Sequence, residues 1–213
     1  MDKVAIKADE NLQKKPYIGQ FLSLKCAGDV LNVVNPIGKK ATKEISESMA
    51  IMKHLRKIVL KEPMKYFLYD FCAGNAITSV IASHLLPITG AMAIDNRPRK
   101  REWHLCKKFL YRTINLYEYP IKSISTNSII IAVHPCKNLA KEIINIYLKS
   151  DASHLIMMPC CNGPISLIAN QEIKKTIDPY HLWCLELTFL CNGNMRIDNG
   201  AITPKNIIIT ASK

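Results

Sequence analysis

Residues 66–95 read YFLYDFCAGNAITSVIASHLLPITGAMAID. The pattern predicts a strand, a tight turn of small residues, a helix and a second strand that ends in an acid. Asp70 closes the first strand, Gly74 lets the backbone approach a ligand closely, and Asp95 stands where an acid accepts hydrogen bonds from ribose hydroxyls. Because no Gly-x-Gly-x-x-Gly follows the first strand, the stretch favours a nucleoside ligand without a pyrophosphate over a dinucleotide.

Two further motifs follow predicted strands at 128–133 and 154–158. His134-Pro135-Cys136 comes after the first, and Pro159-Cys160-Cys161-Asn162 comes after the second. In an open parallel sheet, the carboxyl ends of neighbouring strands surround the point where strand order reverses, and ligands bind there. We therefore expect both motifs to lie beside the turn at 72–76.

The three motifs together resemble the class I S-adenosylmethionine-dependent methyltransferases, over roughly residues 64–213. Asp-x-Cys-x-Gly, His-x-Cys and Cys-Cys are typical of a subgroup that includes acceptor-stem tRNA ribose methyltransferases. Cys72 and Ala76 stand where the commonest form of the first motif has Gly, and Lys137 replaces the Gly that usually follows His-x-Cys. The resemblance implies a Rossmann-like α/β fold, a mostly parallel seven-stranded sheet with helices on both faces and a closing antiparallel hairpin.

The resemblance also implies S-adenosyl-L-methionine as cofactor. The residues expected to bind it are Asp70, Cys72, Ala73, Gly74, Asn75, Asp95, Asn96 and His134. A sulfonium methyl group is transferred by in-line displacement, so the protein mainly positions the two reactants and excludes water. His134 has the one side chain in the predicted cleft with a pKa near neutrality, which makes it a candidate base for a ribose hydroxyl, although a hydrogen-bonded structural role is the alternative. The candidate catalytic residues are His134, Cys136, Cys161 and Asn162.

The cysteines in these motifs allow three interpretations. Cys136, Cys160 and Cys161 with His134 resemble a three-Cys, one-His zinc set, but adjacent cysteines rarely ligate one metal, and no metal is expected. A cysteine nucleophile would need a nearby cation or helix N-terminus, such as Lys137 beside Cys136 or a helix starting near residue 164. The preferred interpretation is a tight turn of small side chains lining the acceptor site, with Asn162 touching the substrate. The remaining cysteines are expected to be free thiols.

Positive charge is concentrated in two segments. Residues 1–65 hold 13 Lys and Arg against 7 acids, residues 97–112 hold 7 against 1, and the rest is neutral. Such a distribution is typical of a surface that binds a polyanion, although a solvated face is the alternative. In the second segment the spacing predicts one cationic helix face that contacts RNA, with Trp103, Cys106, Phe109 and Leu110 opposite; its contact residues are Arg97, Arg101, Lys108 and Arg112.

The rest of the chain sets the predicted domain organisation. Residues 1–40 are interpreted as an irregular or partly β extension, and 41–213 as the methyltransferase-like domain, opening with a helix at 42–60. A weak third strand is predicted at 121–124, a helix near 180–190 and strands at 195–198 and 206–211. No long apolar run or secretory signal is seen, so we expect a soluble, cytoplasmic protein without membrane contact.

Three functions fit these observations. The first is an RNA methyltransferase, with tRNA among its possible substrates. The second is a protein methyltransferase, and the third is a non-catalytic module that keeps the fold to bind RNA or a partner. A nicotinamide oxidoreductase is disfavoured by the turn at 72–76.

Overall fold

The computed structural model describes residues 16–36, 40–166 and 171–213 of the 213-residue chain. One seven-stranded sheet runs through it, with strand order β3-β2-β1-β4-β5-β7-β6. The strands are β1 (Phe67–Phe71), β2 (Gly90–Asp95), β3 (Phe109–Thr113), β4 (Ser128–Val133), β5 (His154–Met158), β6 (Asn194–Ile197) and β7 (Ile207–Ser212). β1 to β5 pair in parallel, whereas β7 is antiparallel to both β5 and β6. The predicted Rossmann-like methyltransferase fold, closing hairpin included, is confirmed.

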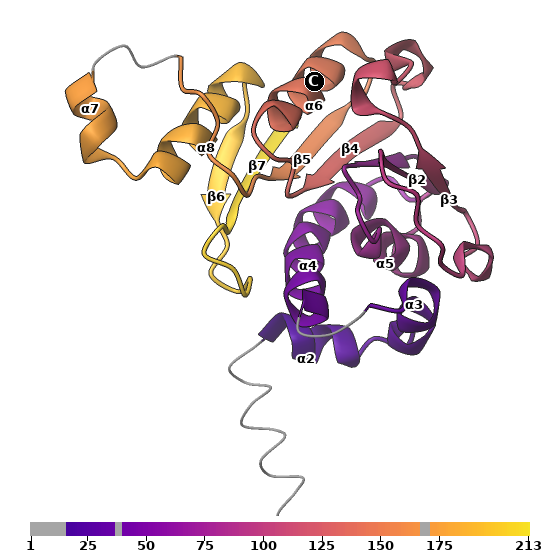
Figure 1. Ribbon diagram of the computed structural model, residues 1–213. Coiled ribbons are helices and arrows are strands. Elements are labelled where there is room, and N and C mark those ends of the chain that lie inside the picture. The colour runs from indigo at the N-terminus through magenta and orange to yellow at the C-terminus, as the bar shows by residue number, and fades with distance from the viewer. Residues whose placement is uncertain (1–15, 37–39, 167–170) are drawn as a thin grey trace, which may run out of the picture.

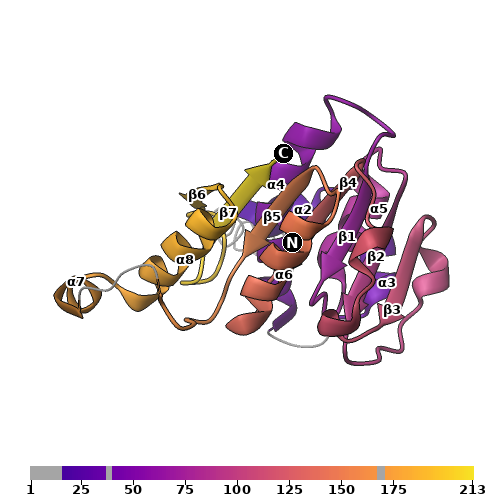
Figure 2. The ribbon, with the colours of Figure 1, turned by 90° about the horizontal axis from the view of Figure 1, so that it is seen from above.

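The helices cover both faces of the sheet (Figures 1 and 2). They are α2 (Pro16–Leu22), α3 (Ala27–Val34), α4 (Lys40–Val59), α5 (Ile77–Leu85), α6 (Asn138–Lys149), α7 (Gln171–Thr176) and α8 (Pro179–Leu190). α2 to α5 pack on one face, where their apolar side chains join Leu68 and Ile131 of the strands in one core cluster. α6 and α8 pack on the other face with Phe71 and Ile130. Alternate strand residues thus point into opposite cores, as a sheet covered on both sides requires.

The N-terminal segment differs from the prediction. Residues 16–34 form α2 and α3 rather than an irregular or β extension. Val30, Val33 and Val34 are buried, and their spacing of three and one is helical rather than alternating. Gly28 lies in the first turn of α3, where it does not interrupt the helix. The first 15 residues of the predicted extension lie outside the described residues.

The segment at 97–124 also differs. The predicted helix at 97–112 is instead a loop, a short 3-10 helix (η1, Trp103–Leu105) and the edge strand β3. The predicted strand at 121–124 is a 3-10 turn (η3, Ile121–Ser123). Tyr111 on β3 stacks on Trp103 with ring centroids 5.0 Å apart and planes at 4°. β3 was missed because an edge strand that is largely exposed carries no strong apolar pattern.

Strand order reverses between β1 and β4, since β2 and β3 lie to one side of β1 and β4 and β5 to the other. The turns that follow β1, β2 and β4 therefore meet at one end of the sheet. Among the described residues, no helix combines the length and apolar character needed to cross a bilayer.

Candidate functional site

In the turn after β1, every second residue has a left-handed backbone conformation. Cys72, Gly74 and Ala76 have φ of 58°, 53° and 56°. Cys72 and Ala76 are the positions where the commonest form of the motif has Gly. The backbone at both keeps a conformation that favours glycine, which costs a residue with a side chain about 1–2 kcal/mol. A Cβ added at Gly74 would meet no atom within 4 Å, which leaves open space over this part of the turn.

The acid at the end of β2 is held against this turn. Asp95 is 5% exposed; its Oδ2 accepts a hydrogen bond from the backbone N–H of Gly74 at 2.9 Å. Its Oδ1 accepts from the backbone N–H of Arg97 at 3.0 Å and from Arg97 Nε at 3.1 Å. Burial alone would raise the pKa of Asp95, but these hydrogen bonds hold it below the usual value. An ionised carboxylate offers about four acceptor positions, so Asp95 retains capacity on Oδ2 for a ribose hydroxyl.

Two adjoining cavities open at this end of the sheet and share Cys72, Arg97 and His134 in their walls. The larger, of 390 Å³, is lined by Asp95, Asn96, Cys136 and residues 114–117. The smaller, of 180 Å³, is lined by Ala73, Gly74, Asn75 and residues of α4 and α5. The volume and the polar groups are those of a site for a nucleoside-sized ligand. Seven of the eight residues predicted to bind the cofactor line one or both cavities.

The eighth, Asp70, lies behind the turn rather than in a cavity wall. It is 1% exposed, and Oδ2 accepts a hydrogen bond from Ser79 Oγ at 2.7 Å. Burial raises the pKa of Asp70 to about 7, although the hydrogen bonds from Ser79 oppose this. Because Ser79 belongs to α5, Asp70 ties the end of β1 to the helix that follows the turn.

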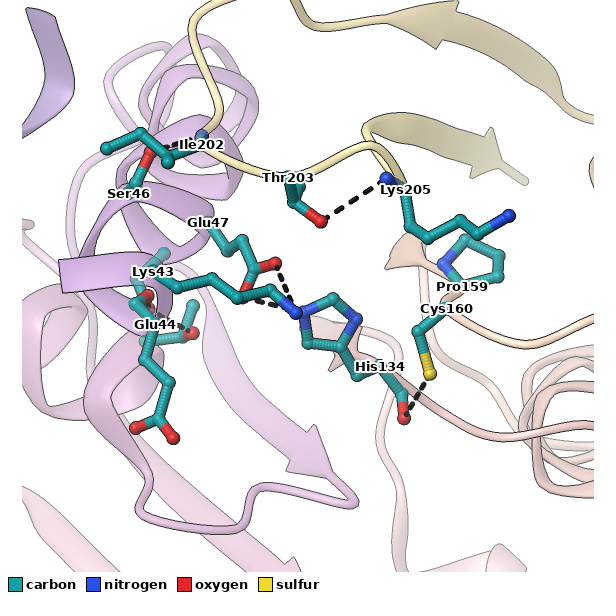
Figure 3. A network of polar contacts seen from close by, with 12 residues as sticks. Lys43, Glu44, Ser46, Glu47, His134, Pro159, Cys160, Ile202, Thr203 and Lys205 are labelled. Atoms are coloured by element: carbon teal, nitrogen blue, oxygen red, sulfur yellow. Dashed lines mark hydrogen bonds and ion pairs between the residues drawn. The ribbon is translucent and has the colours of Figure 1, made fainter. Parts of the chain in front are cut away.

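His134 points away from the cysteines and toward α4 (Figure 3). It has φ of 62°, and its Nε2 lies 2.6 Å from Oε2 of Glu47, whose side chain is fully buried. The contact is a close approach of ring and carboxylate rather than an aligned hydrogen bond, because within the described chain neither carboxylate oxygen nor ring nitrogen meets hydrogen-bond geometry with any group. Lys43, one turn earlier on α4, lies 3.6 Å from Oε1 of Glu47.

Glu47 is the site residue that the sequence interpretation missed. Glu44 and Glu47 both belong to α4, and both line the smaller cavity. Glu44 Oε2 accepts a hydrogen bond from Asn75 Nδ2 at 3.0 Å. Ser46 Oγ accepts from the backbone N–H of Ile202 at 2.9 Å, so the loop between β6 and β7 covers this part of α4 (Figure 3). A carboxylate buried by a distant loop leaves no local signal in the sequence.

The cysteines of the last two motifs form one cluster. The Sγ atoms of Cys136, Cys160 and Cys161 lie 3.4 Å from one another in all three pairs. Burial raises the pKa of Cys136 and of Cys160, which disfavours a resting thiolate at either position. The helix expected near residue 164 does not form in the described part of this segment, because residues 162–166 have no regular structure. Lys137 lowers the pKa of Cys136 without offsetting the effect of burial, so this cation does not supply the thiolate that the nucleophile interpretation needs.

Cys161 and Asn162 stand outside the walls of the two cavities. Asn162 is exposed, and Cys161 is partly buried against the other two thiols. Of the four candidate catalytic residues, only His134 and Cys136 border the cleft.

The cationic segment does not form one helix face. Arg97 is bound to Asp95 at the carboxyl end of β2. Lys108 precedes β3 and reaches the carbonyl of Ile88 at the opposite end of the sheet, 3.4 Å from its Nζ. Arg112 lies on β3 opposite Ile94, near the cleft, and Arg101 lies in the loop before η1. The four predicted RNA contacts are thus spread along a sheet edge.

Residues 39–167, more than half of the chain, match the sequence profile of a family described as a methyltransferase domain. The chain belongs to this methyltransferase family. None of the curated protein sequences compared with it matches significantly. The prediction of a class I S-adenosylmethionine-dependent methyltransferase is confirmed, whereas its relation to tRNA ribose methyltransferases stays a prediction.

Solved structures share the fold of this methyltransferase. A magnesium protoporphyrin IX methyltransferase from Synechocystis PCC 6803 with bound S-adenosylhomocysteine is 8% identical with a TM-score of 0.53, covering 89% of this chain and 94% of that one. A ribosomal protein L11 methylase from Lactobacillus delbrueckii subsp. bulgaricus is 11% identical with a TM-score of 0.50, covering 78% and 79%. At these identities the likeness supports the fold and leaves the methyl acceptor undecided.

Proposed function

We propose that this S-adenosylmethionine-dependent methyltransferase acts on RNA. The proposal rests on α4, because this helix contributes side chains both to the cleft and to a cationic groove. Its middle places Glu47 in the cleft, and its second half places Lys53, Arg56 and Lys57 in the wall of a groove of 1010 Å³. At 1.5 Å per residue these cations begin about 9 Å along the helix from Glu47. A polyanion bound in the groove would thus lie along the same helix that reaches the cleft.

The groove is electropositive. Burial lowers the pKa of His54, and the nearby cations Lys57 and Lys53 lower it further. Asp198 partly offsets this charge, since its Oδ2 lies 3.4 Å from Lys53 Nζ. Within the described chain neither Arg56 nor Lys57 forms an ion pair, so both remain available to phosphates. Neutralising phosphates with such side chains releases counterions, and affinity should therefore fall steeply with salt.

In the cleft, the bound cofactor supplies an electrophilic methyl group on a sulfonium. Asp95 and Asn96 hold its nucleoside half in the larger cavity, while the bare backbone at Gly74 allows close approach. His134, held by Glu47 between the two cavities, orients the acceptor group toward the methyl-donor position. The side chains of this chain thus mainly position the reactants and exclude water, which is what an in-line displacement requires.

The test is methyl transfer from labelled S-adenosylmethionine into total cellular RNA and protein, followed by RNase or protease digestion. Label that RNase releases supports the proposal, with a tRNA fraction as the first purified substrate. Label released by protease alone would identify a protein acceptor and overturn it.

A paired charge reversal tests the groove directly. Arg56→Glu with Lys57→Glu should lower RNA affinity and flatten its salt dependence while S-adenosylmethionine binding is unchanged. Lys107→Glu with Lys122→Glu, two exposed cations outside the groove, is the matched control. Equal loss of RNA affinity in both double variants would show that the groove contributes no more to RNA binding than exposed positive charge elsewhere.

A further inference from the structure

The cysteine cluster joins two loops that follow neighbouring parallel strands. Cys136 lies three residues after the end of β4, and Cys160 and Cys161 follow β5. The backbone N–H of His134 donates to the carbonyl of Met158 at 2.8 Å, which extends the pairing of the two strands beyond their ends. This contact brings the loops together, and all three sulfurs then face one another at 3.4 Å.

The arrangement has the dimensions of a thiolate metal site. Three sulfurs bound to one tetrahedral zinc at about 2.3 Å lie about 3.8 Å apart. The observed separations need to widen by only a few tenths of an ångström to admit the ion. All three ligand atoms fall within 4.8 Å of one another, and within the described chain this is the one such group of three or more His, Cys, Asp or Glu side chains.

His134 is excluded as the fourth ligand, because its ring is turned toward Glu47. What faces the sulfurs from His134 is its backbone carbonyl, 3.6 Å from the Sγ atoms of both Cys136 and Cys160. The side chains therefore supply three ligands and leave one position open. A site with three protein ligands and an open position keeps room for water or another small ligand.

Thiols lose their protons when they coordinate a divalent ion, so the three sulfurs would bind such an ion as thiolates.

The geometry points to a zinc site: we propose that Cys136, Cys160 and Cys161 bind one zinc ion as thiolates. Coordination forms three Zn–S bonds, and the displaced thiol protons pass to solvent. Thiolate ligands select zinc among the common divalent ions. The ion would fix the loop after β4 to the loop after β5 beside the larger cavity, whose wall includes Cys136.

The sequence did not predict this site, because adjacent cysteines seldom bind one metal ion. The backbone conformation at Cys161 removes this objection. A bend at Cys161 turns its sulfur and that of Cys160 toward the same point, so both reach Cys136 at 3.4 Å.

The test is the metal content and zinc affinity of the full chain, purified under reducing conditions without added chelator. Elemental analysis should find about one zinc per chain, and competition with a chromophoric chelator gives the affinity. Cys136→Ser and Cys160→Ser should each weaken zinc binding by about 100-fold or more. Cys26→Ser, which changes a partly buried cysteine at the start of α3, is the matched control and should leave it unchanged.

Two results would overturn the proposal. One is that reduced, folded chain neither contains zinc nor competes for it. The other is that alkylation and mass analysis find a disulfide among the three cysteines in chain purified without reductant, with no zinc bound after reduction. Cobalt substitution adds a readout independent of activity, because thiolate coordination gives intense ligand-to-metal absorption that the Ser variants should lose.

Discussion

Glu47 on α4 and His134 in the turn after β4 lie 2.6 Å apart, although 87 residues of chain separate them. The carboxylate is fully buried, whereas 23% of the histidine side chain is exposed at the cleft. A buried acid that contacts a partly exposed ring fixes the direction in which that ring points. The pair therefore holds the ring of His134 at the border between the two cavities.

Glu47→Gln should lower kcat on the order of 10²-fold, because a misplaced positioning group has effects of this size. Cofactor affinity should fall less than kcat, since Glu47 lines the smaller cavity and not the larger one that holds Asp95. Steady-state kinetics and calorimetric titration measure the two quantities. Glu44→Gln is the control on the same helix and should affect kcat far less. Equal losses in both variants would show that α4 itself, rather than the contact with His134, governs the rate.

The sequence predicted which residues meet around the turn after β1, because these residues lie in short turns after strands. Gly74 and Asp95 are within one β-α-β unit, so local spacing brings them together. Lys137, at the position where the resembling subgroup has Gly, has a positive φ of 48°. Glu47 was not predicted, because parts of the chain distant in sequence surround it. His134 contacts its carboxylate, and Ile202 donates its backbone N–H to the neighbouring Ser46.

The prediction of a cationic helix at residues 97–112 was wrong for a different reason. Steps of three and four between Arg97 and Arg112 match a helix. Phe109 and Tyr111 instead pair with β2, and both rings pack against Trp103. Tertiary packing overrides periodicity where exposed charges define the pattern and apolar residues do not.

Asp95→Asn should weaken S-adenosylmethionine binding by about 1–3 kcal/mol, the scale of a hydrogen bond to a charged group. The variant also removes the ion-pair partner of Arg97, so its thermal midpoint should be measured beside the titration. Asp151→Asn, at an exposed position, is the control. Unchanged affinity in a folded Asp95 variant would remove this residue from the cofactor site.

Asp70 should make the stability of the protein depend on pH. Its pKa is about 7 in the folded chain and about 3.9 when unfolded, so the folded state binds more protons between these values. The unfolding free energy should therefore fall as pH rises from about 4 to 7. Asp70→Asn keeps an acceptor for Ser79 but does not titrate, so this fall should be abolished. The unfolding free energy of the variant should therefore rise relative to that of the wild type as pH increases from about 4 to 7. Urea unfolding at pH 5 and pH 8 measures the gain; a difference that is the same at both values would contradict the raised pKa.

Arg112 and Lys108 lie on and just before β3, about 13 Å apart at the rise of an extended strand. Only Arg112 lies at the cleft end, because it pairs with Ile94, one residue before Asp95, whereas Lys108 is directed to Ile88. Arg112→Glu should therefore lower RNA affinity and reduce the logarithmic salt slope by about 0.7 for a single-stranded contact. Lys108→Glu carries the same charge change and should alter both quantities less. Fluorescence anisotropy over a salt series compares them, with cofactor binding measured on each variant. An identical response from the two variants would mean that β3 contributes only general positive charge, because position along the strand would then have no effect.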